Sequence, residues 1–316
     1  MVIRNEPCKT YDMENLNKPS AEGFKSGFIV ITGAPNVGKS TLLNRMVGDK
    51  ISITSRKPQT TRNKISGVVH RPFAQLVFID TPGVHKARGR LNAKMIDVAF
   101  SSMDGMDIIL VVVDAAGRSP QSEQVLISKA KKQKNPVILV LNKVDLVKKS
   151  IINDLVNKWS MDKYFQAVIP VSAKRGTNLE YLLCKMESLL PNGPPFFPED
   201  AITDMPERFI AAEMIREKVF RLTGQEIPYS TAVTVENFTE DIQKSLVLID
   251  AVIHVERNSQ KGMIIGKNGL KLKKIGEESR KEIEQMVGVR VFLKLFVRVQ
   301  KNWSTNPKAL EKFGYL

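Results

Sequence analysis

Short runs of apolar, mostly β-branched residues recur along the chain from residue 27 to about residue 191, and longer amphipathic stretches separate them. The runs read FIVIT, AQLVFID, DIILVVVD, NPVILVLN and AVIPVS. Continuous apolar strands of this kind are typical of a parallel sheet that helices bury on both faces. The pattern therefore predicts an α/β domain with a mostly parallel sheet.

A different order of elements follows the segment PNGPPFFPED at 191–200, where proline and glycine disfavour regular structure. A helical stretch leads into two strand-like runs, a glycine turn between two helices, and a last strand, VRVFLKLFVRVQ. The order α-β-β-α-α-β predicts a compact α+β unit. We expect an extension without regular structure at 1–25, a first domain at 26–192, a linker at 193–204 and a second domain at 205–316.

The first glycine loop, GAPNVGKS, fits the pattern G-x4-G-K-[ST] and lies between the strand FIVIT and an amphipathic helix. Its backbone N–H groups can surround a phosphate at the helix amino terminus, where the helix dipole also favours negative charge. Lys39 is expected to reach the β- and γ-phosphates, and the Ser40 hydroxyl to bind Mg²⁺. Such a string arises by chance only ~0.01 times in a chain of this length, so an ordinary glycine turn is the weaker interpretation.

Three further motifs end predicted strands, at the edge where open α/β sheets bind ligands. Asp80 opens the motif DTPG, and its carboxylate can hold Mg²⁺ while the Gly83 N–H senses the γ-phosphate. The other two motifs are NKVD at 142–145 and SAK at 172–174. Asp145 can accept hydrogen bonds from N1–H and the 2-amino group of guanine, whereas adenine would leave this carboxylate unpaired.

Together and in this order, the four motifs resemble the translation-factor-related GTPase family over roughly residues 27–190. The resemblance implies GTP hydrolysis and places the first switch in SITSRKPQTTRN. Thr61 is the expected second Mg²⁺ ligand with Thr60 as the fallback, although this stretch also fits a plain polar loop. Lys39, Thr61 and Gly83 are the expected catalytic residues, and Ser40, Thr61 and Asp80 the metal ligands. The full predicted nucleotide site comprises Gly33, Ala34, Pro35, Asn36, Val37, Gly38, Lys39, Ser40, Thr41, Thr60, Thr61, Asp80, Thr81, Pro82, Gly83, Asn142, Lys143, Asp145, Ser172, Ala173 and Lys174.

The sequence departs from the best-known GTPases after DTPG, where Val84 stands in place of a glutamine that orients the attacking water. We therefore expect slow intrinsic hydrolysis. Asn36 matches a residue that binds K⁺ in some relatives, so K⁺ is a further candidate ion beside Mg²⁺, although Asn36 could equally serve only to stabilise the loop. A monovalent cation there would supply the charge that an arginine finger supplies elsewhere.

Composition and charge indicate the class of molecule that the chain binds. The chain has 316 residues, 42% of them hydrophobic, with a formal net charge of +15. Between His254 and Leu316 there are 14 Lys and Arg but only 6 Asp and Glu, which indicates a phosphate-rich partner, nucleic acid first and an acidic membrane surface second. No apolar run has the length of a membrane span, and the amino terminus lacks the apolar core of a secretory signal. With its two cysteines fitting no disulfide framework or metal spacing, the chain is expected in the cytoplasm.

The second glycine loop, GKNG at 266–269, lies in the basic region. In a chain with 19 glycines a G-x-x-G occurs about once by chance, so its context decides. Met263, Ile264 and Ile265 are expected to pin one helix, and Leu270, Leu272 and Ile275 the next. The element order and loop position resemble a type II KH domain, in which this loop clamps about four nucleotides of a single strand; the alternative is a plain helix–turn–helix join. The predicted RNA-binding residues are Ile265, Gly266, Lys267, Asn268, Gly269, Lys271, Lys273 and Lys274.

A GTPase domain followed by a single KH domain, with the strings ITSRKPQTTR, FFPEDAITD, ERFIAAEMIREKVF and EIPYSTAV, resembles bacterial GTPases of small-subunit ribosome assembly. The resemblance implies a GTP-gated monomer that binds the 3′ end of small-subunit ribosomal RNA and the small subunit. It also implies peripheral association with the inner membrane. Two alternatives remain: a membrane-surface regulatory GTPase whose basic domain binds acidic lipid, and a metabolic enzyme driven by GTP, for which the sequence offers no second catalytic constellation.

Overall fold

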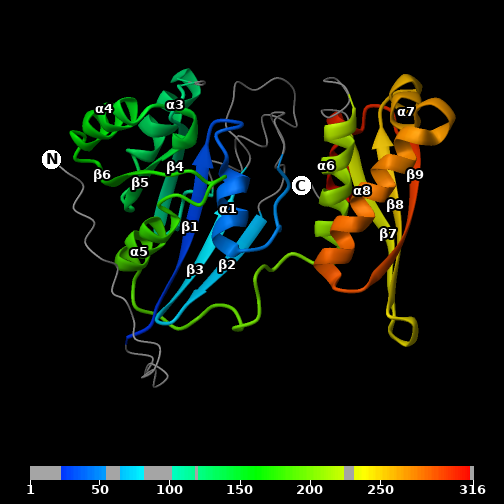
Figure 1. The fold of residues 1–316 in the computed structure, drawn as a ribbon, viewed down its shortest axis with the longest axis horizontal. Coiled ribbons are helices and arrows are strands. Elements are labelled where there is room, and N and C mark those ends of the chain that lie inside the picture. Colours follow the sequence, from blue (N-terminus) through cyan, green and yellow to red (C-terminus); the bar gives the residue numbers. More distant parts are fainter. Residues whose placement is uncertain (1–22, 55–64, 82–101, 118–119, 224–230, 314–316) are drawn as a thin grey trace. The chain divides into compact units, whose positions relative to one another are not determined.

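The computed structural model describes residues 23–54, 65–81, 102–117, 120–223 and 231–313. These residues divide into two compact units (Figure 1). Of the described residues, the first unit comprises 23–48, 66–80, 102–117 and 120–202, and the second comprises 49–54, 65, 81, 203–223 and 231–313. Each unit contains its own sheet, as the sequence predicts.

The first unit is built on a six-stranded sheet with strand order β2-β3-β1-β4-β5-β6. β1 pairs in parallel with both β3 and β4, and parallel pairing continues through β5 to β6. β3, β4 and β5 are buried along their whole length, which confirms the prediction of continuous apolar strands inside an α/β layer. The strands are β1 Lys25–Gly33, β2 Ile65–Arg71, β3 Ala74–Asp80, β4 Ile108–Asp114, β5 Val137–Asn142 and β6 Phe165–Pro170.

The strand β2 is absent from the sequence-based prediction. Its residues, ISGVVHR, mix small and polar side chains with apolar ones, and only two residues separate it from β3. So tight a connection joins antiparallel neighbours, which makes β2 the one edge strand added to an otherwise parallel sheet. This strand carries no nucleotide-site residue, so its omission leaves the predicted site intact.

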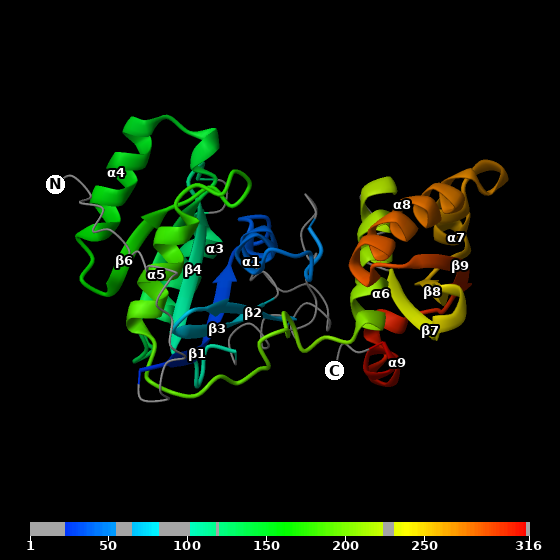
Figure 2. The same cartoon turned by 60° about the horizontal axis from the view of Figure 1, so that its bottom comes forward.

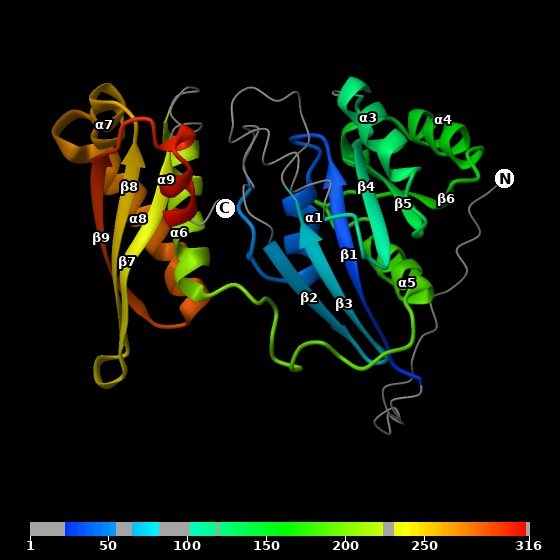
Figure 3. The same cartoon turned by 180° about the vertical axis from the view of Figure 1, so that it is seen from behind.

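Helices cover the parallel strands of the first unit (Figures 1 and 3). α1 packs against β1 and β3, α3 against β1 and β4, and α4 against β6. Since each strand ends at the same edge before its helix begins, the connecting loops gather there. The helices are α1 Lys39–Val47, α3 Pro120–Ala130, α4 Lys149–Ser160 and α5 Leu179–Leu189, with a 3-10 turn η2 at Val144–Leu146.

The proline-rich segment after α5 is held against the first sheet by hydrogen bonds. The side chain of Gln75 accepts from the N–H groups of Phe196 and Phe197, at 2.6 and 3.0 Å, and donates to the Phe197 carbonyl at 2.8 Å. The N–H of Val68 donates to the Ile202 carbonyl at 2.9 Å. Residues 193–202 thus contribute to the first unit although they form neither helix nor strand.

The second unit has the predicted order α-β-β-α-α-β, with a terminal helix in addition. Its sheet has the order β7-β8-β9, in which β8 pairs antiparallel with β7 and parallel with β9. The elements are α6 Glu207–Leu222, β7 Ala232–Asp241, η4 Ile242–Lys244, β8 Leu246–Val255, α7 Asn258–Ile265, η5 Lys267–Gly269, α8 Leu270–Val287, β9 Arg290–Val299, η6 Trp303–Thr305 and α9 Pro307–Lys312.

α6, α7 and α8 lie on one face of this sheet and α9 on the other (Figures 2 and 3), with an apolar cluster on each side. The larger cluster joins α6, α7 and α8 to the helix-facing side chains of the strands, with Ile264, Ile275 and Ile283 at its centre. The smaller one packs α9 against the opposite face through Trp303, Leu310 and Phe313. One face of the sheet is thus covered by three helices, and part of the other by a single short one.

Two further observations bear on the sequence-based expectations. None of the helices within the described ranges is long and apolar enough to cross a membrane. Cys184 is disulfide-bonded. This corrects the expectation that the two cysteines fit no disulfide framework.

Candidate nucleotide site and RNA interface

The phosphate loop connects β1 to α1, as the motif requires. Gly38 caps α1 with a φ of 100°, in the left-handed region, and a Cβ there would collide with the side-chain amide of Asn142. Only glycine fits this position, since it alone adopts the conformation without strain and leaves the neighbouring amide in place. The loop therefore presents the amino terminus of α1 toward the edge of the sheet where a phosphate is expected.

Lys39 is buried at the base of the loop. Its Nζ donates to the carbonyls of Gly33 and Ala34, at 3.1 and 3.0 Å. Burial lowers the pKa of Lys39 from 10.5 to about 8, against the opposing attraction of Asp80. The ammonium is thus held by two neutral carbonyls, and the phosphates of a nucleotide would supply a strong counter-charge within its reach.

Ser40 lies in the first turn of α1 and Asp80 ends β3, yet the two meet directly, with the Ser40 hydroxyl donating to Asp80 Oδ2 at 2.7 Å. Both present oxygen, the donor that Mg²⁺ prefers, and Asp80 is fully buried. Among the described residues no three His, Cys, Asp or Glu side chains group as a metal site, so two protein oxygens beside phosphate oxygens are the arrangement that fits. Magnesium typically binds one or two protein oxygens together with substrate phosphates and water.

Several predicted residues of the switch segments cannot be placed. Thr60 and Thr61 fall in the range 55–64, and Pro82, Gly83 and Val84 in the range 82–101, both outside the described residues. Their roles stay predictions. Thr81 is described and is fully buried beside Asp80.

The predicted guanine-binding residues come together at the ends of β5 and β6. The side chain of Asn142 donates to the Val37 carbonyl at 2.8 Å and accepts from the Ala173 N–H at 3.0 Å, which ties the phosphate loop to the SAK loop. The Ser172 hydroxyl donates to Asp145 Oδ1 at 2.6 Å. This hydrogen bond holds the pKa of Asp145 below its usual value, so the carboxylate is ionised and ready to accept from guanine.

Asp114 is a site residue that the sequence analysis missed. It ends β4, where its buried carboxylate pairs with Lys143 Nζ at 2.8 Å. Lys143 has a left-handed backbone, with φ at 66°, and its Nζ also donates to the carbonyl of Asn36 in the phosphate loop. Asp114 thus positions the lysine of the NKVD motif. The sequence does contain a feature that could have identified it: Asp114 is the last residue of the apolar run DIILVVVD, just as Asp80 is the last residue of AQLVFID.

The second glycine loop has the geometry of a tight turn between α7 and α8. Gly266, Asn268 and Gly269 all have positive φ, at 72°, 52° and 74°. A Cβ on Gly266 would lie 2.7 Å from Lys271 Cβ, whereas a Cβ on Gly269 would meet open space. Gly266 is therefore required by the turn itself, and Gly269 leaves the outer surface of the turn open to a close-approaching backbone.

The loop is basic and partly apolar on its exposed side. Lys267, Lys273 and Lys274 are exposed, and Lys271 is half-buried. Ile264 and Ile275 are fully buried and pin the two helices as predicted, with Leu272 packed beside them. The same prediction is wrong for two residues, because Met263 and Leu270 are 50% and 64% exposed. They flank the turn on the solvent side, where they add apolar surface beside the lysines.

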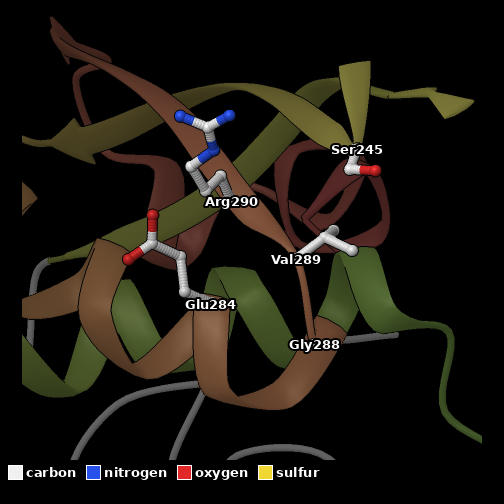
Figure 4. A pocket seen from close by; sticks show the side chains of 5 residues that line it. All are labelled: Ser245, Glu284, Gly288, Val289 and Arg290. Atoms are coloured by element: carbon white, nitrogen blue, oxygen red, sulfur yellow. The ribbon is translucent and has the colours of Figure 1, made fainter. Parts of the chain in front are cut away.

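An open pocket lies elsewhere in the second unit, between the end of α8 and the start of β9 (Figure 4). Its walls include Glu284, Gly288 and Arg290, and Glu284 Oε1 accepts from the N–H of Val291 at 3.0 Å. The 18 residues of α8 separate it from the GKNG turn by about 27 Å. It contains none of the predicted RNA-binding residues.

Comparison with known proteins agrees with both halves of this description. Residues 28–143 match the model of a family described as 50S ribosome-binding GTPase, and residues 226–304 match that of the KH domain. The chain is 53% identical over 292 residues to the GTPase Era of Geotalea daltonii, which covers 92% of this chain and 98% of that protein. It is 47% identical over 293 residues to the GTPase Era of Syntrophus aciditrophicus, covering 92% and 95%.

Two solved structures are similar over nearly the whole chain. One is Era in complex with MgGDPNP and nucleotides 1506–1542 of 16S ribosomal RNA, with a TM-score of 0.87, 38% identity, and coverage of 92% of this chain and 99% of that one. The other is a single-residue variant of Aquifex aeolicus Era bound to GDP.AlF4-, with a TM-score of 0.88 at the same identity and coverage. With its nucleotide loop, its KH domain and this identity to curated relatives over almost their full length, the chain belongs to the Era family of GTPases.

Proposed function

We propose that this GTPase is a switch that binds the single-stranded 3′ region of small-subunit ribosomal RNA through its KH domain and assists maturation of the small ribosomal subunit. The observation that carries the proposal is the open, basic GKNG turn on a chain that also holds a guanine-nucleotide site. The similar solved structure of Era contains 16S ribosomal RNA. The family described by its binding to the 50S subunit matches only residues 28–143, whereas that structure also covers the KH domain.

Magnesium fits the nucleotide site, with Ser40 and Asp80 as ligands and Thr61 as the further predicted one. When bound, Mg²⁺ would neutralise charge on the β- and γ-phosphates. The chain's own residues do the remaining work. Lys39 turns from the loop carbonyls to the phosphates, the amino terminus of α1 binds the β-phosphate, and Asp145 selects guanine.

We also propose that K⁺ assists hydrolysis at Asn36. This residue is exposed in the phosphate loop and has a left-handed backbone, so its side chain is available beside the phosphates. Hydrolysis is expected to be slow without such a cation, because Val84 cannot orient water. Equal rates of GTP hydrolysis in K⁺ and Na⁺ at matched ionic strength would contradict this role.

The RNA-binding function is tested by the change Gly269→Asp, with binding of a short single-stranded RNA as the measurement. The new side chain would project into the open space over the turn and place a negative charge where a phosphate approaches. We expect loss of RNA binding with GDP affinity unchanged. Gly48→Asp, also at a positive φ with open space around its Cβ but in the first unit, is the matched control and should leave RNA affinity as it is.

Binding of acidic lipid and binding of RNA by the same lysines are expected to respond differently to a substitution in the turn. Vesicles with acidic headgroups would be bound through charge alone and should not respond to Gly269→Asp beyond the loss of about one charge. If Gly269→Asp keeps its affinity for RNA, the turn is structural and the proposed function fails. Binding of acidic vesicles in the absence of RNA binding would then favour a membrane-surface GTPase.

A further inference from the structure

The last strand of the second unit, β9, carries alternating side chains on its two faces. Val291 is buried against the helices, and Leu293, Leu295, Val297 and Val299 pack on the same apolar core. The intervening residues point to the opposite face, away from α7 and α8. They form a row that we call the outer β9 row: Arg290, Phe292, Lys294, Phe296 and Arg298, all of them exposed.

Two aromatic rings stand out in this row. Phe292 is 52% exposed and Phe296 is 53% exposed, unusual for phenylalanine in a folded domain. Phe196 is the other half-exposed phenylalanine in the described parts of the chain, and it packs on Phe28 with ring centroids 4.7 Å apart. Lys294 Nζ lies 5.5 Å from the centroid of the Phe292 ring, so a cation is held beside an open aromatic face.

Only part of this sheet face is exposed, because other parts of the chain cover the rest. At one end α9 covers it: His254 stacks on Phe313 with centroids 4.4 Å apart, and both are buried. Farther along the register Phe292 lies beside Leu248 of β8, which is only half-buried. The chain therefore covers one end of the outer face with its own terminal helix and leaves the aromatic end open.

The charges in the outer β9 row favour a polyanion. Arg298 pairs with Glu236 of β7 at 3.0 Å, and Asp250 of β8 lies next to Lys294 in the register. Against these two acids stand the three cations of the row, which leaves an excess of one positive charge around the two rings. An apolar protein partner would have no use for cations between the rings. A single-stranded nucleic acid uses both the aromatic rings, on which bases stack, and the cations, which bind phosphates.

We propose that the outer β9 row is a second single-stranded RNA surface, on which bases stack on Phe292 and Phe296 while Lys294 and Arg290 bind phosphates. Four residues of strand separate the rings by about 13 Å, which suits bases of one extended strand that are about two nucleotides apart. β9 is an edge strand of its sheet and packs on α7 and α8, which flank the GKNG turn. An RNA strand bound at that turn can therefore reach the outer face of the sheet by passing over the β9 edge.

This inference rests on the proposed function, and the experiment separates the two. The affinities of two RNAs that share one sequence, about 5 and about 14 nucleotides long, are measured at one salt concentration with the full chain. Phe292→Ala and Phe296→Ala should each weaken the longer RNA about tenfold, because stacking on one aromatic side chain contributes about that factor or more. The shorter RNA, which the turn alone accommodates, should be unaffected.

Conservative changes distinguish stacking from general apolar contact. Phe292→Trp should bind the longer RNA at least as tightly as the parent chain, whereas Phe292→Leu should resemble Phe292→Ala, because leucine keeps apolar area without an aromatic face. Ile242→Ala is the matched control, since Ile242 is an exposed apolar residue of the same unit, 87% exposed, outside the row. It should change neither affinity.

The possible outcomes fall into distinct classes. Unchanged affinity for the longer RNA in the Phe292→Ala, Phe296→Ala double variant, or full affinity in Phe292→Leu, would overturn the second surface and leave this face to a protein partner. Retention of short-RNA binding in Gly269→Asp would instead contradict the proposed function of the turn. The two phenylalanine variants would still decide whether the outer β9 row binds RNA.

Discussion

At the scale of single residues, Asp145 is the side chain that we propose selects the base. Its carboxylate is ionised and oriented by the Ser172 hydroxyl at 2.6 Å, with two acceptor oxygens for the two donors of guanine. Asp145→Asn replaces one acceptor by a donor. We expect GTP affinity to fall at least a hundredfold, about 3 kcal/mol, and xanthosine triphosphate to become the better ligand. Competition binding with both nucleotides measures the change, and unchanged GTP affinity would refute the assignment.

Lys39 makes nucleotide affinity depend on pH. Burial lowers the pKa of Lys39 to about 8, and the phosphates of a bound nucleotide would raise that pKa. Above pH 8 the complex therefore binds more protons than the free protein, so affinity falls as pH rises, by about tenfold per unit. Below pH 8 Lys39 is charged in both states and this dependence disappears.

The measurement is GDP affinity between pH 7 and 9.5 at constant ionic strength. Lys39→Arg is the control, because its guanidinium stays protonated throughout and any remaining slope comes from the nucleotide itself. An identical slope in the parent chain and in Lys39→Arg would show that Lys39 does not titrate in this range.

Sequence patterns gave most of this site because each motif fixes chemistry and position together. A glycine loop between a strand and a helix predicts Lys39 and Ser40 directly, and acids at strand ends predict Asp80 and Asp145. Asp114 escaped prediction because it acts on Lys143 rather than on the nucleotide, and only the fold shows that neighbouring strands β4 and β5 bring the two together. Positioning residues are defined by contacts distant in sequence, which a motif does not encode.

At the scale of elements, α6 shows what periodicity alone misses. The sequence predicts a helix at PERFIAAEMIREKVFRLTG but does not show which of its residues are buried. In the structure every residue from Ile210 to Phe220 is buried, including Glu213 and Arg216. The described residues 49–54 account for part of this, since the N–H of Thr54 donates to Glu217 at 3.0 Å.

The charges on α6 satisfy one another and their neighbours. Arg216 Nε donates to Glu213 at 2.7 Å, and Lys50 Nζ lies 3.0 Å from Glu217 and 2.8 Å from Glu282. Burial opposes ionisation of Glu282, but hydrogen bonds from Lys218 and Lys50 hold its pKa below the usual value. Such a network depends on every partner, because a buried charge that loses its counter-charge is costly.

Glu213→Ala is accordingly expected to destabilise the second unit by about 3 kcal/mol, because it removes a buried carboxylate from the fully buried guanidinium of Arg216. Urea unfolding measures the change in a Trp159→Phe background, where the buried Trp303 reports on the second unit. Glu277→Ala, an exposed glutamate on α8, should change stability by less than about 0.5 kcal/mol. Equal effects of the two substitutions would contradict a structural role for the α6 network.

At the scale of the whole molecule, the chain joins two glycine loops, which we propose bind different polyphosphates. The phosphate loop lies in the first unit and the GKNG turn in the second, so any influence of GTP on RNA has to pass between them. Binding free energies are reciprocal: a factor by which GTP raises RNA affinity is the factor by which RNA raises GTP affinity. A switch is thus distinguished from a mere tether by a single coupling free energy.

The most direct test of the account is the affinity of a short single-stranded RNA with the ribosomal 3′ sequence, at one fixed salt concentration, for two forms of the chain. One form is loaded with a non-hydrolysable GTP analogue and the other with GDP. We predict tighter binding in the GTP form by about tenfold, a coupling of about 1.4 kcal/mol, and loss of binding in both forms of Gly269→Asp. Equal RNA affinity in the two forms of the parent chain would contradict the switch.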